Sequence, residues 1–213
     1  MKERPIIFSG EMVLAILAGR KIQTMRVMKP QPEMDKMRWN GERWEMYMGY
    51  PIGHDIPISP YGEPGDRLWV RETCAIGFTD SGELACDYFA DGKRKYFERT
   101  IYNDADRGWM TYINDGKRPS IFMPRWASRI TLRIASVRVE RLQEISVADA
   151  IAEGVYYRQV VKENHRAFPH DYLKSFSDLW NSINAKRGWP WESNPWVWMI
   201  EFRVLEPAEA SNL

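Results

Sequence analysis

The sequence predicts an α+β fold in which several short strands form a small mixed β-barrel, with flanking helices and large loop insertions. Three observations support this class. The predicted helices stand at the ends of the element order instead of alternating regularly with strands. The chain has neither a G-x-G-x-x-G nor a P-loop motif, which disfavours a doubly wound sheet. Finally, the longest predicted strand changes its apolar alternation part-way, as bent strands do.

The first predicted element is a short helix with Ser9 as its N-cap and Gly19 just beyond its last turn. Its apolar stripe has the helical spacing i, i+3 and i+4 and consists of Val13, Ile16 and Leu17. A turn and a short strand around residues 25–27 follow. The strand is flanked by prolines at positions 30 and 32.

The middle of the chain predicts strands and a hairpin. Residues 65–72 follow a Pro-Gly turn and alternate as a strand does. Asp91-Gly92, between two apolar runs, predicts a hairpin turn. The long strand at 128–142 alternates up to Ile134, slips at Ala135-Ser136 and resumes with Val137.

Two helices and a strand are predicted in the last third. Ser146 and Asp149 form an S-x-x-D capping box, and Gly154 ends the helix that they open. A second helix is expected from Asp171 to Arg187, with an apolar stripe of Leu173, Phe176, Trp180 and Ile183. Residues 196–204 are β-branched and aromatic and predict the closing strand. We expect one domain over 1–206, with insertions near 30–64, 73–118 and 156–170 and a C-terminal tail at 207–213.

Composition excludes several classes of protein. With 30 Lys and Arg against 29 Asp and Glu, the net charge is +1, which argues against a protein that coats nucleic acid. It does not exclude a pocket that binds a single base. No apolar run reaches the roughly 20 residues of a membrane-spanning helix. The start of the chain lacks the pattern of a secretory leader, so we expect a soluble, cytoplasmic protein.

Metal and cofactor chemistry is not indicated by the sequence. The three histidines show no ligand spacing, and the two cysteines, Cys74 and Cys86, are typical of a reducing compartment. We therefore expect no metal and no cofactor. Ten tryptophans are an excess; most are expected to pack in the core, and Trp69 is the one candidate for stacking on a base.

The candidate site lies just after the first helix, where polar residues cluster between Arg20 and Arg26. One interpretation is structural, because Arg20 and Lys21 can satisfy the carbonyls left open at a helix C-terminus. The other interpretation is functional and depends on a resemblance.

The run 17–26 resembles the helix-end signature of the ASCH-domain family, a branch of the PUA-like β-barrel superfamily. Three further segments are similar to family segments in the same order: the Gly-Asp strand at 65–70, the strand-to-helix segment at 142–154, and the closing strand at 198–202. The chain as a whole also resembles the longer ASCH proteins of phages and prophages, which implies a viral or prophage origin.

Some small bacterial members of that family are amidohydrolases that remove the acetyl group from N4-acetylcytidine. The resemblance implies that Lys21 is the base, Thr24 the nucleophile and Glu153 the acid and base. A buried lysine has a depressed pKa and can activate a threonine hydroxyl. The family has threonine or serine after the lysine, whereas this chain has Ile22.

Substrate contacts are expected from Arg26, Arg20 and Trp69, and the expected partner is a nucleoside or RNA. On a regular strand, positions 21 and 24 face opposite sides, so the two side chains converge only if the preceding turn is irregular. Glu153 can also be a solvated helix-end carboxylate, and Arg71 with Glu72 is expected to form a cross-strand ion pair.

Two other functions remain open at this point. One is a non-enzymatic reader of RNA or of a modified base, in which cations contact phosphates. Its expected contacts are Arg20, Lys21, Arg26, Arg125, Arg129 and Arg133. The other is a ribonuclease that uses the same basic cleft.

Overall fold

The computed structural model describes residues 1–32, 37–39, 44–46, 59–98, 111–112, 116–155, 168–206 and 209. The chain forms two compact units. Unit 1 consists of Met1–Ala18, Asp66–Arg133 and Val204–Leu213, and unit 2 of Gly19–Gly65 and Ile134–Arg203. The single domain over 1–206 stays a prediction.

Unit 1 begins with β1 (Glu3–Ile7), which pairs in parallel with β5 (Arg67–Arg71). The first residues of β10 (Thr131–Arg141) pair with β5 on its other side, antiparallel. The sequence did not predict β1, because the strand begins with Glu3, Arg4 and Pro5, which form no strand pattern. Pro5 is tolerated because β1 stands at one end of the strand order, where a missing donor costs little.

Helix α1 (Gly10–Leu17) follows β1 and begins as predicted, with the Ser9 side chain accepting from the backbone N–H of Met12. The predicted stripe is wrong in its last member, because Leu17 is 47% exposed. At about 100° per residue, the buried arc runs from Ala15 through Ile16 to Val13, and Leu17 lies past its edge.

A second sheet of unit 1 has the strand order β8-β7-β6-β9. Its strands are β6 (Cys74–Phe78), β7 (Leu84–Tyr88), β8 (Arg94–Phe97) and β9 (Thr111–Tyr112). The antiparallel pair β7 and β8 confirms the hairpin predicted at Asp91-Gly92. Cys74 and Cys86 are buried in the apolar cluster of this sheet. Three-residue 3-10 turns, η4 (Ser120–Phe122) and η5 (Arg125–Ala127), precede β10.

Unit 2 contains the rest of β10, together with β11 (Trp196–Val204) and β2 (Gln23–Val27), in the order β10-β11-β2. The predicted strands at 25–27, 128–142 and 196–204 are therefore confirmed. A separate antiparallel pair consists of β3 (Met37–Trp39) and β4 (Trp44–Met46). The predicted α+β class is also confirmed. Among the described strands, β1 pairs with β5 alone and β2 with β11 alone, so these pairings do not close a barrel.

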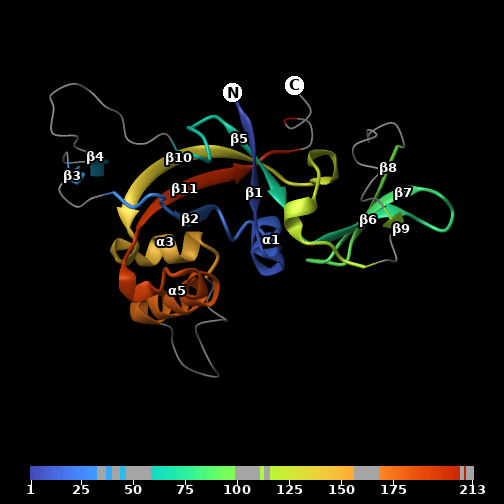
Figure 1. Cartoon of the computed structure of the whole chain (residues 1–213). Helices are drawn as coiled ribbons and strands as arrows, with labels where there is room; N and C mark the ends of the chain where they lie inside the picture. The colour runs from blue at the N-terminus through green and yellow to red at the C-terminus, as the bar shows by residue number, and fades with distance from the viewer. Residues whose placement is uncertain are drawn as a thin grey trace. The chain divides into compact units, whose positions relative to one another are not determined.

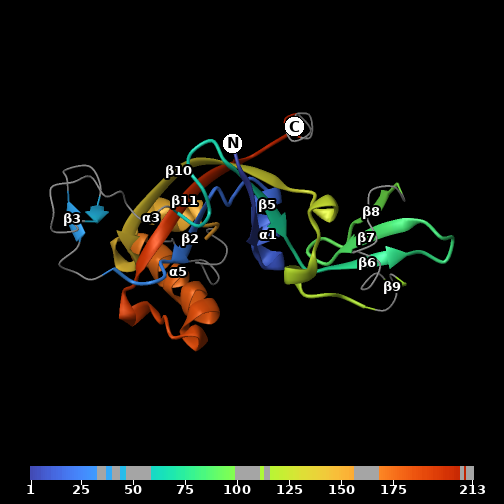
Figure 2. The same ribbon diagram turned by 45° about the horizontal axis from the view of Figure 1, so that its top comes forward.

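Helices α3 (Val147–Ala152) and α5 (Pro169–Asn184) lie together on one side of β10 and β11 (Figures 1 and 2). The capping box of α3 is confirmed. Helix α5 begins two residues before the predicted start, because Pro169 suits a first helical turn. Its predicted last residues form the 3-10 turn η7 (Ala185–Arg187), and a second such turn, η8 (Trp191–Ser193), precedes β11.

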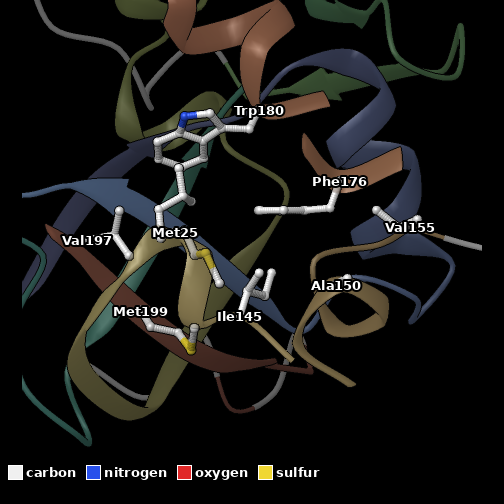
Figure 3. Close-up of a cluster of buried hydrophobic side chains, with 9 residues drawn as sticks. Met25, Ile145, Ala150, Val155, Phe176, Trp180, Val197 and Met199 are labelled. Atoms are coloured by element: carbon white, nitrogen blue, oxygen red, sulfur yellow. The ribbon is translucent and has the colours of Figure 1, made fainter. Parts of the chain in front are cut away.

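The core of unit 2 joins these helices to the strands. Figure 3 shows Phe176 and Trp180 of α5 pointing toward Met25 of β2 and toward Val197 and Met199 of β11. Phe176 and Trp180 are 2% and 4% exposed, as their predicted place on the apolar stripe requires. This packing fixes β2 and the two helices against each other. None of the helices in the described part of the chain has the length and apolar character that a membrane crossing needs.

Candidate active site

The link that leads into β2 places Lys21. Gly19 has a φ of +67°, a left-handed conformation that glycine adopts without strain. The backbone N–H of Ile22 donates to the carbonyl of Ala152 at the end of α3 (2.9 Å), and its carbonyl accepts from Phe202 of β11 (2.8 Å). Lys21 therefore precedes the regular strand, in a link that is held to α3 on one side and to β11 on the other.

The end of α3 places Glu153. Ser146 and Asp149 close the first turn of this short helix reciprocally, and Glu153 is its C-cap. The next residue, Gly154, has a φ of +98°, which lets the chain turn away at once. Both ends of a six-residue helix are thus fixed by local hydrogen bonds, and Glu153 is left at a defined position facing the start of β2.

Lys21 and Glu153 are in direct contact. The Lys21 Nζ donates to the backbone carbonyl of Glu153 (2.9 Å) and to its carboxylate Oε2. Lys21 is 1% exposed and Glu153 is 5% exposed. The second carboxylate oxygen, Oε1, is buried and has no hydrogen-bond partner within the described residues. A buried carboxylate with one oxygen left over is able to exchange a proton with a further group.

Burial shifts the pKa of Lys21 downward. The attraction of Glu153 opposes this effect, and the positive charge of Arg26 adds to it. Burial also lowers the pKa of Arg26, with Tyr61 and Glu153 acting against the shift and Arg187 acting with it. The neutral amine form of Lys21 is therefore easier to reach than in water, which a general base requires.

Thr24 lies on β2, opposite Ile200 of β11, and is 2% exposed. It shares a face of the strand with Arg26, because positions two apart point to the same side. Met25 points to the other side, into the core cluster. Lys21 stands outside the strand, so the strand alternation does not by itself keep it away from Thr24.

The other expected contacts fare differently. Arg20 is exposed, in contrast with its neighbour Lys21. Trp69 belongs to unit 1, where it is 7% exposed and lies 4.6 Å from the guanidinium carbon of Arg71. The expected ion pair of Arg71 with Glu72 is wrong: the buried carboxylate of Glu72 accepts from Nε and one terminal nitrogen of Arg129, whose other terminal nitrogen donates to Asp91.

Sequence reasoning missed two residues near Arg26. Both affect the pKa of Arg26: Tyr61 raises it and Arg187 lowers it. Tyr61 stands in a turn in which the Ser59 hydroxyl accepts its backbone N–H, and Arg187 follows α5 in η7. Neither lies in a motif, so no local signal was available to find them.

The described residues were also compared with the ligand groups that metal ions need. Within the described residues, no three or more His, Cys, Asp and Glu side chains are grouped so that they could hold a metal ion.

Comparisons with known proteins add little to this geometry. The chain matches no protein-family model and no curated protein. One solved structure is similar to it, the crystal structure of an ASCH domain from Lactobacillus crispatus JV V101, with a TM-score of 0.40 and 10% sequence identity. The similarity covers 95% of this chain and 79% of that chain. Likeness at this level does not assign the chain to a family.

Proposed function

We propose that this protein is an amidohydrolase that removes the acyl group from an acylated nucleoside or base such as N4-acetylcytidine. The observation that carries the proposal is the contact of two buried groups, Lys21 and Glu153, beside a strand that bears Thr24. Motif resemblance suggested the same three residues. The contact adds a physical reason, because it joins a base to an acid.

The paired groups can share one proton. In the ion pair that proton is on Nζ, and in the neutral pair it is on the carboxylate. The two forms differ only by its movement along the hydrogen bond that joins Nζ and Oε2. Burial lowers the pKa of Lys21 and so favours its neutral amine. The neutral pair offers an amine base and a carboxylic acid together, and it needs no proton from solvent.

In the first half-reaction, the Thr24 hydroxyl oxygen attacks the carbonyl carbon of the acyl group. The hydroxyl proton goes to the Lys21 amine. As the bond from the carbonyl carbon to the exocyclic nitrogen breaks, the carboxylic acid of Glu153 gives its proton to that nitrogen. The products are the free nucleoside amine and an ester on Thr24, with Lys21 now an ammonium and Glu153 a carboxylate.

In the second half-reaction, water hydrolyses the ester. The Glu153 carboxylate takes one proton from water while the water oxygen attacks the ester carbonyl. The ester bond breaks, and the Lys21 ammonium returns a proton to the Thr24 oxygen. Acetic acid leaves, and all three residues are back in their starting protonation states.

Arg26 suits the negative charge that develops on the carbonyl oxygen during both attacks. It shares a face of β2 with Thr24, and its positive charge lowers the pKa of Lys21. A fixed cation near a developing oxyanion stabilises the transition state more than the ground state. We assign this role to Arg26 as part of the proposal.

A purely structural role for the pair is the competing interpretation. A buried ion pair fastens the start of β2 to the end of α3, although its desolvation often cancels its attraction. The two roles differ in what a substitution does. A structural pair changes stability alone, whereas a reacting pair changes turnover in a protein that still folds.

The reader of RNA is the second candidate, and one observation counts against the set of contacts expected for it. Lys21, Arg125 and Arg129 each form an ion pair with a carboxylate, so these three cations are already neutralised. Phosphates would have to compete with those partners. The ribonuclease would rely on the same cations and is weakened in the same way.

The test is incubation of the purified protein with N4-acetylcytidine, followed by chromatographic separation of the nucleosides and an assay for acetate. We expect cytidine and acetate in equal amounts and in proportion to enzyme concentration. Recovery of unchanged N4-acetylcytidine, with oligonucleotide binding that weakens as salt rises, would instead favour the reader.

A further inference from the structure

Arg138 of β10 stands among three acidic side chains of unit 2. Its Nε donates to Glu140 of the same strand (2.6 Å), one terminal nitrogen donates to Glu201 of β11, and the other donates to Asp149 of α3 (2.7 Å). The three guanidinium nitrogens therefore hold carboxylates from two strands and a helix. Because a planar guanidinium presents its donors at fixed angles, these contacts fix the orientation of the helix as well as its distance from the strands.

Asp149 connects this guanidinium to the candidate site. Its Oδ2 accepts from the backbone N–H and the hydroxyl of Ser146, while its Oδ1 accepts from Arg138. The backbone carbonyl of Asp149 accepts from the backbone N–H of Glu153 (2.8 Å). The residue that Arg138 holds by its side chain thus holds Glu153 by its main chain, one helical turn further on.

Helix α3 has only six residues, so its place depends on contacts with its neighbours. Isolated helices shorter than about 12–15 residues are marginal in water. Arg138 holds the first turn, and Ala150 is buried in the core. At the far end, the carbonyl of Ala152 accepts from the backbone N–H of Ile22. Loss of the first contact would let the helix pivot about the other two, and Glu153 would move with it.

Asp149 is a carboxylate at neutral pH. Burial acts to raise its pKa, but the hydrogen bonds from Ser146 and the positive charge of Arg138 outweigh burial and lower the pKa. The hydrogen bond between Arg138 and Asp149 is therefore charge-assisted at both ends, and such bonds are stronger than neutral ones.

We propose that Arg138 is a positioning residue for the hydrolase: acting through Asp149, it holds Glu153 against the amine of Lys21. This inference rests on the proposed function, in which Lys21 and Glu153 exchange a proton. The nitrogens of Arg138 are occupied by other carboxylates, so Arg138 acts on Glu153 through the helix and not by contact. Small displacements of a reacting group slow proton transfer strongly.

Two variants separate this role from the effect of charge. Arg138→Gln removes one positive charge, so the net charge falls by one. Arg138→Met/Glu140→Gln/Glu201→Gln removes one positive and two negative charges, so the net charge rises by one, and it leaves fewer carboxylates without a cation. A change of the same sign in both variants cannot come from the field of the lost charges.

The matched control is Arg94→Gln, which breaks an ion pair in unit 1 that also has two hydrogen bonds between one arginine and one carboxylate, that of Asp87. Thermal unfolding curves check that every variant folds. The charge-balanced triple variant keeps the test available where Arg138→Gln alone fails to fold.

Steady-state kinetics with N4-acetylcytidine provide the first readout. We expect kcat to fall by about 10- to about 100-fold in both Arg138 variants, with KM within about 2-fold of the wild type, because proton transfer is slowed while substrate contacts are kept. Arg94→Gln should have the wild-type kcat. An unchanged kcat in folded Arg138 variants, a rise in KM alone, or an equal loss in Arg94→Gln would overturn the proposal.

The pH dependence of kcat/KM is a second readout, which a loss of stability alone does not move. The attraction of Glu153 raises the pKa of Lys21 against the effect of burial. If the two groups separate, the pair holds its shared proton less tightly, and the alkaline limb of the profile should move to lower pH in both Arg138 variants. The field of the lost cation alone would move it to higher pH in Arg138→Gln. An alkaline limb at the wild-type pH would overturn the proposal.

A titration without substrate separates this inference from the hydrolase itself. NMR of isotope-labelled lysine follows the ionisation of Lys21, with Lys21→Met to assign its signal. We expect a lower pKa of Lys21 in both Arg138 variants than in the wild type, since Arg26, whose charge also affects this pKa, is left in place. If the wild type does not cleave N4-acetylcytidine but this shift occurs, the hydrolase proposal fails and Arg138 still holds Glu153 against Lys21. An unchanged pKa of Lys21 would overturn the positioning role whether or not the protein is a hydrolase.

Discussion

The Nζ of Lys21 donates to both the backbone carbonyl and the carboxylate of Glu153, a residue 132 positions further along the chain. The contact fixes the segment before β2 to the C-terminal end of α3. Both side chains are buried, so the charge of either one would be strongly destabilising without the opposite charge of the other. The chemistry that we propose for unit 2 depends on this pair.

Replacing Glu153 with glutamine should abolish the acid and base step while keeping the shape of the side chain. We expect the rate of cytidine release from N4-acetylcytidine to fall by about 10² to 10⁴. The matched control is Glu144→Gln, which removes a carboxylate from the exposed turn before α3. Steady-state kinetics of both variants provide the test, and equal rates in Glu153→Gln and the wild type would exclude Glu153 from the reaction.

Thr24 should carry the acyl group during turnover. Acid quenching of the wild-type protein during the reaction, followed by peptide mass spectrometry, should reveal one acetyl group on the peptide that contains Thr24. Thr24→Val keeps the shape of the buried side chain but removes the hydroxyl, so the label and the turnover should both disappear. Full turnover by Thr24→Val would show that water attacks directly.

The lowered pKa of Lys21 predicts how stability changes with pH. A lysine whose pKa in the folded protein lies below its ordinary 10.5 binds its proton less well in the folded chain than in the unfolded chain. Between the two pKa values the unfolded chain holds more protons, so the free energy of unfolding rises with pH in that window. It levels off above the ordinary pKa.

The reference for this measurement is Lys21→Met/Glu153→Gln, which has neither ionisable group. Urea unfolding of both proteins at a series of alkaline pH values gives the difference in their free energies of unfolding. We expect this difference to shift in favour of the wild type as pH rises. A shift in the opposite direction would mean that the attraction of Glu153 outweighs burial and that Lys21 is held as a cation.

The capping box should matter for the site as well as for the helix. Ser146→Ala removes the acceptor of the Asp149 backbone N–H, and we expect a loss of about 1 kcal/mol in the free energy of unfolding. Ser182→Ala, on exposed α5 surface, is the control and should change stability by less. Chemical denaturation of the two variants compares them directly, and equal effects would show that the cap contributes nothing specific.

Local signals in the sequence were sufficient for the parts of the site that depend on neighbouring residues. The capping box at Ser146 and the glycine at 154 fixed where α3 begins and ends, and hence where Glu153 stands. The motif resemblance assigned Lys21 and Glu153 to one site, but their direct contact was not predicted. Spacing does not predict it, because the two residues are brought together by the packing of α3 beside β2.

Other features had no local signal. Tyr61 and Arg187 lie in segments without a motif. Their effect on the pKa of Arg26 depends on the tertiary structure, which brings their charges near it. The exposure of Leu17 and the strand that contains Pro5 were missed for a related reason. Tertiary packing leaves Leu17 exposed despite its helical spacing, and the place of β1 in the sheet accommodates Pro5.

The most direct test of the central claim compares cytidine release from N4-acetylcytidine by the wild-type protein and by Lys21→Met, which keeps the length of the buried side chain but removes the amine. We predict that kcat/KM falls by at least about 10² while the thermal unfolding curve still shows a folded protein. Turnover by Lys21→Met at the wild-type rate would contradict the claim and would leave the Lys21 and Glu153 contact as a structural ion pair.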